Sequence, residues 1–350
     1  MQIDAFLTKM VEIGASDAHF KVGSPPGFRV SGKIQPQGHL TLKPEHTEQV
    51  ARTILSEEQW KTFERDSDLD CSYSIPGVSR FRVNVMRQRG SISLVLRQIP
   101  TKIPSFEELG LPEICKTLSL RPRGLVLVTG PTGSGKSTTL AAMIDLVNST
   151  EEGHILTMED PIEFVHNDKK CFVNQREIGS DTPDFNQALR RALRQDPDVI
   201  LIGEMRDLET IRLAVTAAET GHLVFGTLHT SSAIKTVDRV VSVFPPEEQT
   251  QIRMQFSGAI QGVISQTLLP KIGGGRVAAL EILVANDAVR ALIRENKTAQ
   301  ILTAMQTGKK DGMIILEDRL NQLIAEKKVT FEEAVTKANA PQLIRRPGAT

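Results

Sequence analysis

A glycine-rich segment near the middle of the chain constrains the fold more than any other feature of the sequence. It reads Gly130-Pro131-Thr132-Gly133-Ser134-Gly135-Lys136-Ser137 and matches the pattern G-x-x-x-x-G-K-[ST]. The strand-like run Leu125–Thr129 precedes it, and a helix-like run containing Leu140 and Ile144 follows it. A strand, a glycine-rich turn and a helix in this order form a loop whose backbone N–H groups surround phosphates. The segment therefore predicts a nucleoside-triphosphate site on an α/β sheet.

The side chains of this loop favour ATP and Mg²⁺ as its ligands. We expect Lys136 to place its positive charge on the β- and γ-phosphates and the hydroxyl of Ser137 to bind Mg²⁺. The predicted nucleotide-binding residues run from Gly130 through Thr138. From average residue frequencies, a chance match in a chain of this length occurs on the order of once in a hundred. The strand before the loop and the helix after it reduce that chance further.

Composition bounds the possible partners. The chain has 350 residues, with 42 Lys plus Arg and 42 Asp plus Glu, so no net positive field exists to hold nucleic acid. No stretch approaches eighteen consecutive apolar residues, and we therefore expect neither secretion nor insertion into a membrane. Cys71, Cys115 and Cys171 are isolated in the sequence, which favours reduced thiols over disulfides or a zinc site.

The chain is predicted to contain two domains. Residues 1–98 contain an amphipathic helix near Ile3–Val11, a helical stretch around Val50–Phe63, and short β-branched runs such as Arg80–Met86 and Ile92–Leu96. This pattern predicts a small α+β domain. Two prolines within Ile99–Pro104 favour an extended connector, so residues 99–110 are predicted to be a linker.

Residues 111–350 are predicted to form the second, α/β domain. Strand-like runs alternate there with helical ones, which is typical of a parallel sheet flanked by helices. These runs are Leu125–Thr129, His154–Met158, Val199–Ile202 and Leu223–Thr227.

Acidic residues and a histidine follow three of these strands. Glu204 ends the buried run that begins at Asp198, as a Walker B acid would, although Gly203 stands where many P-loop enzymes have aspartate. A second acidic segment spans Glu159 to Glu163. Because open α/β sheets bind ligands beyond the carboxyl ends of their strands, these acids are candidates for activating water and orienting Mg²⁺. His229 follows a third strand and could donate a hydrogen bond to a γ-phosphate.

Three blocks together resemble those of the secretion-superfamily hexameric ATPases, and within them the retraction ATPases of type IV pili. The blocks are Glu159-Asp-Pro-Ile-Glu163, Gly203-Glu-Met-Arg-Asp207 and Gly221-His222 through His229-Thr-Ser-Ser. They are similar to the family's Asp box, Walker B motif and His box, and the resemblance covers nearly the whole chain. It implies an N-terminal PAS-like domain, a C-terminal RecA-like P-loop domain, and a homohexameric ring.

The resemblance also implies roles for five residues. Glu163 resembles the catalytic glutamate, Glu204 the Walker B glutamate and His229 the His-box histidine. Arg82 and Arg97, fifteen positions apart on two predicted strands, match arginines that reach the γ-phosphate from the N-terminal domain. All five are therefore predicted catalytic residues.

One C-terminal motif departs from the retraction ATPases. They carry Ala-Ile-Arg-Asn-Leu-Ile-Arg-Glu, whereas this chain reads Ala-Val-Arg-Ala-Leu-Ile-Arg-Glu from Ala288 to Glu295. Ala291 lacks the hydrogen-bonding group of the family's asparagine. Arg290 and Arg294, four positions apart on one predicted helical face, are predicted to form a contact surface.

The resemblance implies a cytoplasmic motor that hydrolyses ATP to retract pili in twitching motility. Its implied partners are a PilC-like platform protein of the inner membrane, through which it would associate with that membrane, and a second retraction ATPase. Two alternatives stay open: an accessory retraction ATPase that works beside a principal motor, and a nucleotide-gated ring adaptor without hydrolysis. DNA translocation is disfavoured by the balanced charge and by the 4% aromatic content, which leaves few rings on which bases could stack.

Overall fold

The computed structural model describes residues 2–100 and 102–346. Parts of the predicted N-terminal domain (residue 1), linker (residue 101) and C-terminal domain (residues 347–350) lie outside the described residues. The chain divides into two compact units. The first unit comprises Met1–Lys102 and Glu163–Val165, and the second comprises Ile103–Ile162 and His166–Thr350.

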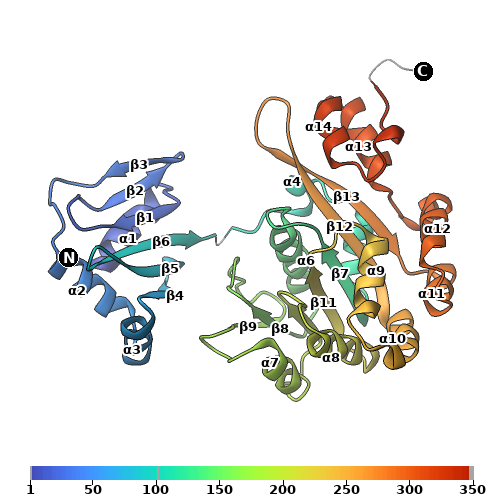
Figure 1. The fold of residues 1–350 in the computed structure, drawn as a ribbon, viewed down its shortest axis with the longest axis horizontal. Coiled ribbons are helices and arrows are strands. Elements are labelled where there is room, and N and C mark those ends of the chain that lie inside the picture. Colours follow the sequence, from blue (N-terminus) through green and yellow to red (C-terminus); the bar gives the residue numbers. More distant parts are fainter. Residues whose placement is uncertain (1, 101, 347–350) are drawn as a thin grey trace. The chain divides into compact units, whose positions relative to one another are not determined.

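The first unit is a six-stranded antiparallel sheet with three helices, and its strand order is β3-β2-β1-β6-β5-β4 (Figure 1). Its elements are α1 (Ile3–Glu12), β1 (Asp17–Phe20), β2 (Gly27–Val30), β3 (Lys33–Pro36), α2 (Pro44–Ile54), α3 (Glu57–Asp66), β4 (Asp68–Ile75), β5 (Ser79–Gln88) and β6 (Ser91–Ile99).

Alternation along the strands gives this sheet one buried face. Phe81, Val83 and Val85 of β5 are fully buried, and they form one core with apolar residues of α1, α2 and α3. The residues between them, among them Arg82, point to the opposite face because successive side chains of a strand alternate in direction. The helices therefore cover one face of the sheet and leave the other for polar side chains.

The single helical stretch predicted around Val50–Phe63 is wrong. The structure has two helices there, α2 and α3, separated at Leu55 and Ser56. The hydroxyl of Ser56 accepts a hydrogen bond from the backbone N–H of Gln59, whose side chain in turn accepts one from the N–H of Ser56. This capping box starts a new helix, and it interrupts what the apolar pattern alone presents as continuous.

The second unit contains a seven-stranded mixed sheet with the order β13-β12-β7-β11-β10-β8-β9. Its strands are β7 (Gly124–Thr129), β8 (His154–Glu159), β9 (Phe172–Glu177), β10 (Val199–Ile202), β11 (Leu223–Leu228), β12 (Ile260–Pro270) and β13 (Arg276–Val284). Its α-helices are α4 (Phe106–Leu109), α5 (Glu113–Ser119), α6 (Lys136–Thr150), α7 (Phe185–Ala192), α8 (Leu208–Glu219), α9 (Ala233–Ser242), α10 (Pro246–Ala259), α11 (Asp287–Arg294), α12 (Ile301–Thr307), α13 (Leu316–Ala325) and α14 (Phe331–Lys337).

The predicted parallel strands are confirmed, and their register aligns their carboxyl ends. β7, β11, β10 and β8 pair in parallel in that order, with Leu228 opposite Thr129 and Ile202 opposite both Gly226 and Met158. The segments that follow these four strands therefore leave the sheet along one edge. In open α/β sheets this edge is where ligands bind. The predicted α/β fold class is confirmed.

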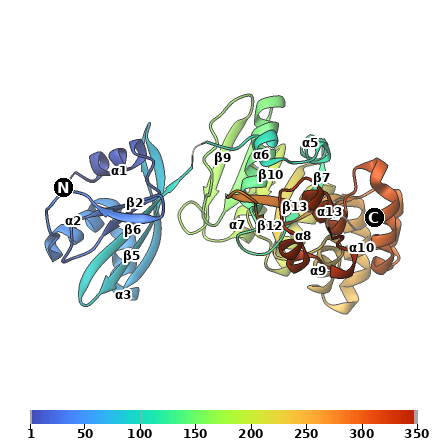
Figure 2. The same cartoon turned by 90° about the horizontal axis from the view of Figure 1, so that it is seen from above.

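The strands β12 and β13 extend the sheet beyond what the sequence analysis identified. β12 runs parallel to β7 and pairs with β13 in an antiparallel hairpin. Helices α13 and α14 pack against this hairpin and share a small apolar core with it (Figures 1 and 2). Because β12 is the immediate neighbour of β7, its side chains reach the loop that follows β7.

Candidate functional site

The predicted phosphate-binding loop connects β7 to α6, and its backbone is shaped by glycines. Gly130, Gly133 and Gly135 have φ values of 143°, 77° and 89°, which disfavour residues with a Cβ atom. A Cβ at Gly130 would come within 2.2 Å of the carbonyl oxygen of Gln266 on β12. The loop is therefore a narrow cradle of backbone, and its shape fits the phosphates of a nucleotide.

Lys136 starts α6 and bends back over this loop. Its Nζ donates hydrogen bonds to the carbonyl oxygens of Gly130 at 2.9 Å and Pro131 at 3.2 Å. Ser137 and Thr138 follow in the first turn of α6, where both are partly exposed. The helix N-terminus adds backbone N–H groups and a partial positive charge. These residues fit a polyphosphate.

A buried glutamine that the sequence analysis did not single out supports the loop from β12. Gln266 is 5% exposed; its Nε2 donates to the carbonyl oxygen of Ser134 at 2.6 Å, and its Oε1 accepts from Oγ1 of Thr139 at 2.7 Å. A Cβ at Gly135 would lie 2.8 Å from Nε2 of Gln266. No sequence pattern marks Gln266, since it is distant from the loop along the chain.

The structure brings Glu204 and His229 together beyond the ends of β10 and β11. Nε2 of His229 lies 2.7 Å from Oε1 of Glu204, and Nη2 of Arg206 donates to Oε2 at 2.7 Å. The hydrogen bond from Arg206 lowers the pKa of the Glu204 carboxyl, with a further contribution from His229, and these effects outweigh partial burial. Glu204 is therefore held as a carboxylate. Arg206 is a site residue that the sequence analysis did not identify.

Gly203, which stands where many P-loop enzymes have aspartate, packs closely against the end of β8. A Cβ at Gly203 would lie 3.1 Å from Cα of Glu159 and 3.1 Å from the carbonyl oxygen of Met158. The N–H of Gly203 donates to that same Met158 carbonyl at 2.8 Å. The ends of β8 and β10 pack closely here, so a side chain at position 203 would require its neighbours to shift by a few tenths of an ångström.

The acids of the predicted Asp box differ in their surroundings. Oε1 of Glu159 accepts hydrogen bonds from Thr157 at 2.6 Å and from Gln175 at 3.1 Å, so this carboxylate is bonded within the sheet. Glu163 is exposed and belongs to the first compact unit. Of the two glutamates, Glu163 is the one whose side chain faces solvent, and its catalytic role stays a prediction.

Arg82 and Arg97 lie directly opposite each other in the β5–β6 pairing of the first unit. Both side chains are exposed, Arg82 at 50% and Arg97 at 70%. Nε of Arg97 donates to Asp17 at 2.8 Å, and Nη2 of Arg82 lies 3.7 Å from Asp70. Burial raises the pKa of Asp17, but hydrogen bonds from Ser16 and Arg97 outweigh it and leave that pKa below its ordinary value. The sheet therefore presents two guanidinium groups side by side.

Two further features bear on metals and membranes. Within residues 2–100 and 102–346, no group of three or more His, Cys, Asp or Glu side chains is arranged to hold a metal ion. The hydroxyl of Ser137 thus stands without a preformed protein cage, as is usual for Mg²⁺ held together with phosphates.

No helix in the described part of the chain is both long and apolar enough to cross a membrane.

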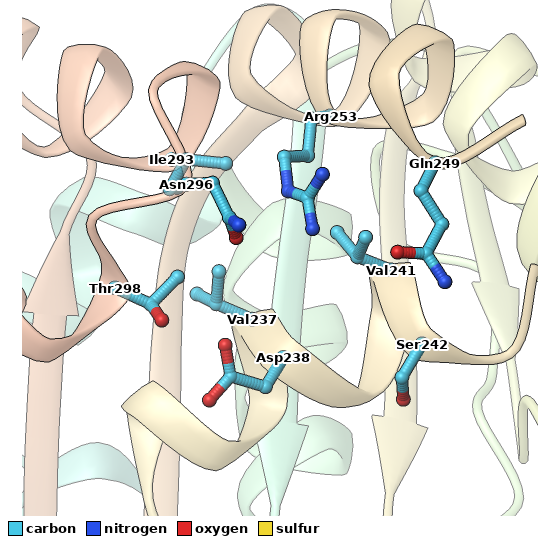
Figure 3. Close-up of a pocket in the computed structure, with 9 residues that line it drawn as sticks. All are labelled: Val237, Asp238, Val241, Ser242, Gln249, Arg253, Ile293, Asn296 and Thr298. Atoms are coloured by element: carbon cyan, nitrogen blue, oxygen red, sulfur yellow. The ribbon is translucent and has the colours of Figure 1, made fainter. Parts of the chain in front are cut away.

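A separate cavity of about 140 Å³ lies among α9, α10 and the segment after α11. Arg253, Asp238 and Asn296 line it and point into it (Figure 3). None of the predicted site residues is among the residues that line it. The cavity is therefore distinct from the phosphate-binding loop.

Arg290, which is predicted to form a contact surface with Arg294, is half-buried and makes hydrogen bonds within the chain. Its Nη1 donates to the carbonyl oxygens of Ser257 and Gly258 at 2.7 Å each, and its Nε donates to that of Ala285 at 2.9 Å. The two bonds from Nη1 satisfy carbonyls in the last turn of α10, which have no partner inside the helix. Arg290 therefore fastens α11 to α10, whereas Arg294 is exposed.

Comparisons with known proteins agree with the motifs. A family model described as "Type II/IV secretion system protein" matches residues 1–275. The "Type IV pilus retractation ATPase PilT" of Pseudomonas aeruginosa is 54% identical over 342 residues, which cover 98% of this chain and 99% of that protein. The "Twitching motility protein" of Neisseria gonorrhoeae is 50% identical over 314 residues, covering 89% of this chain and 84% of that protein.

A solved structure matches along almost the full length. It is described as the "Crystal Structure of the Pilus Retraction Motor PilT and Bound ADP" and has a TM-score of 0.90 and 49% identity, with 98% of each chain covered. The resemblance inferred from the sequence motifs is confirmed. The chain therefore belongs to the Type II/IV secretion system protein family, and within it to the PilT retraction ATPases.

Proposed function

We propose that this chain hydrolyses ATP as a ring of six copies and uses the energy to retract type IV pili, the activity behind twitching motility. The observation that carries the proposal is the 54% identity to a pilus retraction ATPase over 98% of the chain. The phosphate-binding loop, and the Glu204–His229 pair at the same edge of the sheet, supply the chemistry that such an ATPase requires.

In this proposal the residues Gly130–Thr138 bind the phosphates of ATP. The solved relative with bound ADP supports nucleotide as the ligand. Backbone N–H groups of the loop and the N-terminus of α6 face the phosphates, and Lys136 exchanges its carbonyl partners for phosphate oxygens. Mg²⁺, when bound, neutralises charge on the phosphates; the hydroxyl of Ser137 contributes one ligand.

Glu204 and Glu163 are assigned to water activation and to orientation of the metal shell. Glu204 is already a carboxylate, because Arg206 and His229 both bond to it. A carboxylate can accept a proton from an attacking water or hold a metal-bound water in place. His229 is hydrogen-bonded to Glu204 through Nε2. An imidazole nitrogen can also donate to a phosphate oxygen, so His229 would link Glu204 to the presence or absence of the γ-phosphate.

Arg82 and Arg97 are assigned to sensing the γ-phosphate during domain closure. Their position opposite each other on β5 and β6 supports this assignment, because two adjacent guanidinium groups suit an anion with several oxygens. Each is paired with a carboxylate, Arg82 with the exposed Asp70 and Arg97 with the buried Asp17, and a phosphate would compete for the exposed guanidinium groups. Closure coupled to nucleotide state would then drive rotation of the N-terminal domains against the ATPase domains.

The proposed ring and its partners are inferred from the family to which the chain belongs. Six copies would form a cytoplasmic ring that acts on a PilC-like platform protein of the inner membrane and works with a second retraction ATPase. In the accessory alternative this chain assists a principal motor, and the family's asparagine is replaced by Ala291 in the C-terminal motif. A nucleotide-gated adaptor would bind ATP without releasing phosphate.

The test is a strain deleted for this gene and complemented with wild type or with Lys136→Ala. We expect excess surface pili and lost motility on deletion, with rescue by wild type alone. Absent pili would contradict retraction and indicate assembly. Unchanged piliation would contradict a principal motor, and steady-state phosphate release by the purified protein would then separate an accessory ATPase from a non-hydrolysing adaptor.

A further inference from the structure

We propose that Gln266 is a positioning residue that sets nucleotide affinity by fixing one peptide plane of the phosphate-binding loop. The inference rests on the proposed binding of nucleotide by Gly130–Thr138. It adds a residue from β12, a strand that lies more than a hundred positions further along the chain and contributes no part of the loop motif.

The geometry joins three elements through one side-chain amide. Nε2 of Gln266 donates to the carbonyl oxygen of Ser134 at 2.6 Å, and its Oε1 accepts from the hydroxyl of Thr139 at 2.7 Å. Gln266, Ser134 and Thr139 are exposed by 5%, 3% and 2%. Both ends of the amide are thus used. The Ser134 carbonyl can only accept, so it requires the NH2 end of the amide, and the oxygen end is left to accept from the Thr139 hydroxyl.

The bond to Ser134 controls a group that faces the opposite way. In a trans peptide unit the C=O of one residue and the N–H of the next lie in one plane and point in opposite directions. By holding the Ser134 carbonyl toward β12, Gln266 turns the N–H of Gly135 away from β12. Inward-facing N–H groups are what make such a loop bind anions. Gln266 therefore preorganises a donor that it does not itself touch.

The loop glycines pack directly against the same residue. A Cβ at Gly130 would lie 2.2 Å from the backbone oxygen of Gln266, and a Cβ at Gly135 would lie 2.8 Å from its Nε2. The loop therefore has little freedom to move toward β12 and take another conformation. Preorganisation of this kind strengthens binding because less ordering remains to be done when the ligand arrives.

The neutral amide matters as much as its shape. Methionine has nearly the same length but neither donates nor accepts comparably, so Gln266→Met would leave the buried Ser134 carbonyl without its partner. Glutamate has the same shape, but its ionised form cannot donate to that carbonyl, and its charge would oppose the phosphates. Protonated glutamate carries an O–H and can donate again.

The first test is titration of the purified full-length wild type and Gln266→Met with Mg-ADP. We expect the dissociation constant to rise about tenfold in the variant, which corresponds to about 1.4 kcal/mol of binding free energy. The matched control is Gln261→Met. Gln261 lies on the same strand and its Nε2 also donates to a backbone carbonyl, that of Arg123 at 3.0 Å, before the start of β7. This control should bind Mg-ADP within about twofold of wild type.

The second test uses Gln266→Glu and a readout that a structural role alone would not change. Gln266 is 5% exposed, and because burial raises the pKa of a carboxyl we expect the introduced glutamate to titrate above its ordinary range. We expect the ratio of its dissociation constant to that of wild type to approach one at about pH 5.5 and to rise about tenfold or more by about pH 8. Dividing by the wild-type value removes the titration of ADP itself.

The outcomes separate this inference from the proposed function. If wild type binds Mg-ADP and both Gln266 variants bind it equally well at all pH values, the inference is overturned while nucleotide binding stands. Lower melting temperatures with unchanged dissociation constants would likewise overturn it. If Gln266→Met does not fold, the pH profile of Gln266→Glu decides, and a flat ratio refutes the role. Failure of wild type to bind Mg-ADP would refute the proposed function itself.

Discussion

Glu281 should make the stability of the second unit depend on pH. This residue of β13 is 5% exposed, and its Oε1 accepts from the N–H of Ala233, the first residue of α9, at 2.6 Å. Burial raises the pKa of Glu281 to about 7, and the negative charge of Glu317 adds to the rise, while bonds from Ala233 and Leu316 and the charge of Lys235 oppose it. The perturbation to make is Glu281→Gln, which keeps the shape and the acceptor but cannot ionise.

The sign and the size of this pH dependence follow from the pKa of Glu281 in the unfolded chain and in the folded protein. The ordinary pKa is 4.5 and the folded value is about 7. Between them the folded protein binds more protons than the unfolded chain, so the stability that Glu281 contributes is complete below pH 4.5 and is lost as pH rises to about 7. At about 1.4 kcal/mol for each pKa unit, the loss amounts to roughly 3 kcal/mol. Glu281→Gln should not show this loss of stability, because glutamine does not ionise.

The assay is differential scanning calorimetry of wild type and Glu281→Gln in steps from about pH 5 to 8. For a unit of this size, roughly 3 kcal/mol corresponds to about 6 to 12 °C. The melting temperature of Glu281→Gln minus that of wild type should therefore increase by about this amount as pH rises across the range. The control is Glu326→Gln, whose carboxyl has a pKa lowered from 4.5 chiefly by the hydrogen bond from Lys328. Its contribution to stability is present above that pH and is lost only as pH falls below it, so the melting temperature of this variant relative to wild type should stay constant from about pH 5 to 8. A difference between Glu281→Gln and wild type that stays constant with pH would refute the reasoning.

Three further predictions test the site and the core. Lys136→Ala should weaken Mg-ADP binding by roughly a hundredfold or more in a fluorescence titration, because it removes charge-assisted bonds to phosphate; wild-type affinity would exclude Lys136 from the site. Glu204→Gln should retain ATP binding but release phosphate roughly a hundredfold to ten-thousandfold more slowly, and undiminished release would remove its catalytic assignment. Phe225→Ala, fully buried on β11, should cost about 3 to 5 kcal/mol in urea unfolding, and a loss below about 1 kcal/mol would contradict its place in the core.

Local patterns were sufficient for the loop and for the strands that position it. The run Leu125–Thr129, the glycine-rich turn and the apolar helix after it follow one another directly in the chain, so the phosphate-binding loop could be read without tertiary information. The apolar runs of β8, β10 and β11 are each bounded by polar residues, and all were located. The apolar spacing around Val50–Phe63 predicts one helix because it continues across the cap at Ser56, where the structure begins a second helix.

Contacts between distant positions could not be read in the same way. The strands that carry Arg82 and Arg97 were predicted, but only the hairpin register places the two residues opposite each other. Helical spacing puts Arg290 and Arg294 on one face, yet Arg290 faces the end of α10, because carbonyls there require a donor. Spacing along a helix says which side chains share a direction and nothing about what lies in that direction.

The sequence by itself determined the nucleotide-binding chemistry and the α/β class, because both depend on residues adjacent in the chain or on simple periodicity. Tertiary structure alone decided that Glu204 is bonded between Arg206 and His229, and that Gly203 packs closely against the end of β8. It also decided that Gln266 supports a loop residue 132 positions away in the chain, as its bond to the Ser134 carbonyl shows. Pairing of strands and packing of their ends bring such residues together, and no local pattern encodes which ones will meet.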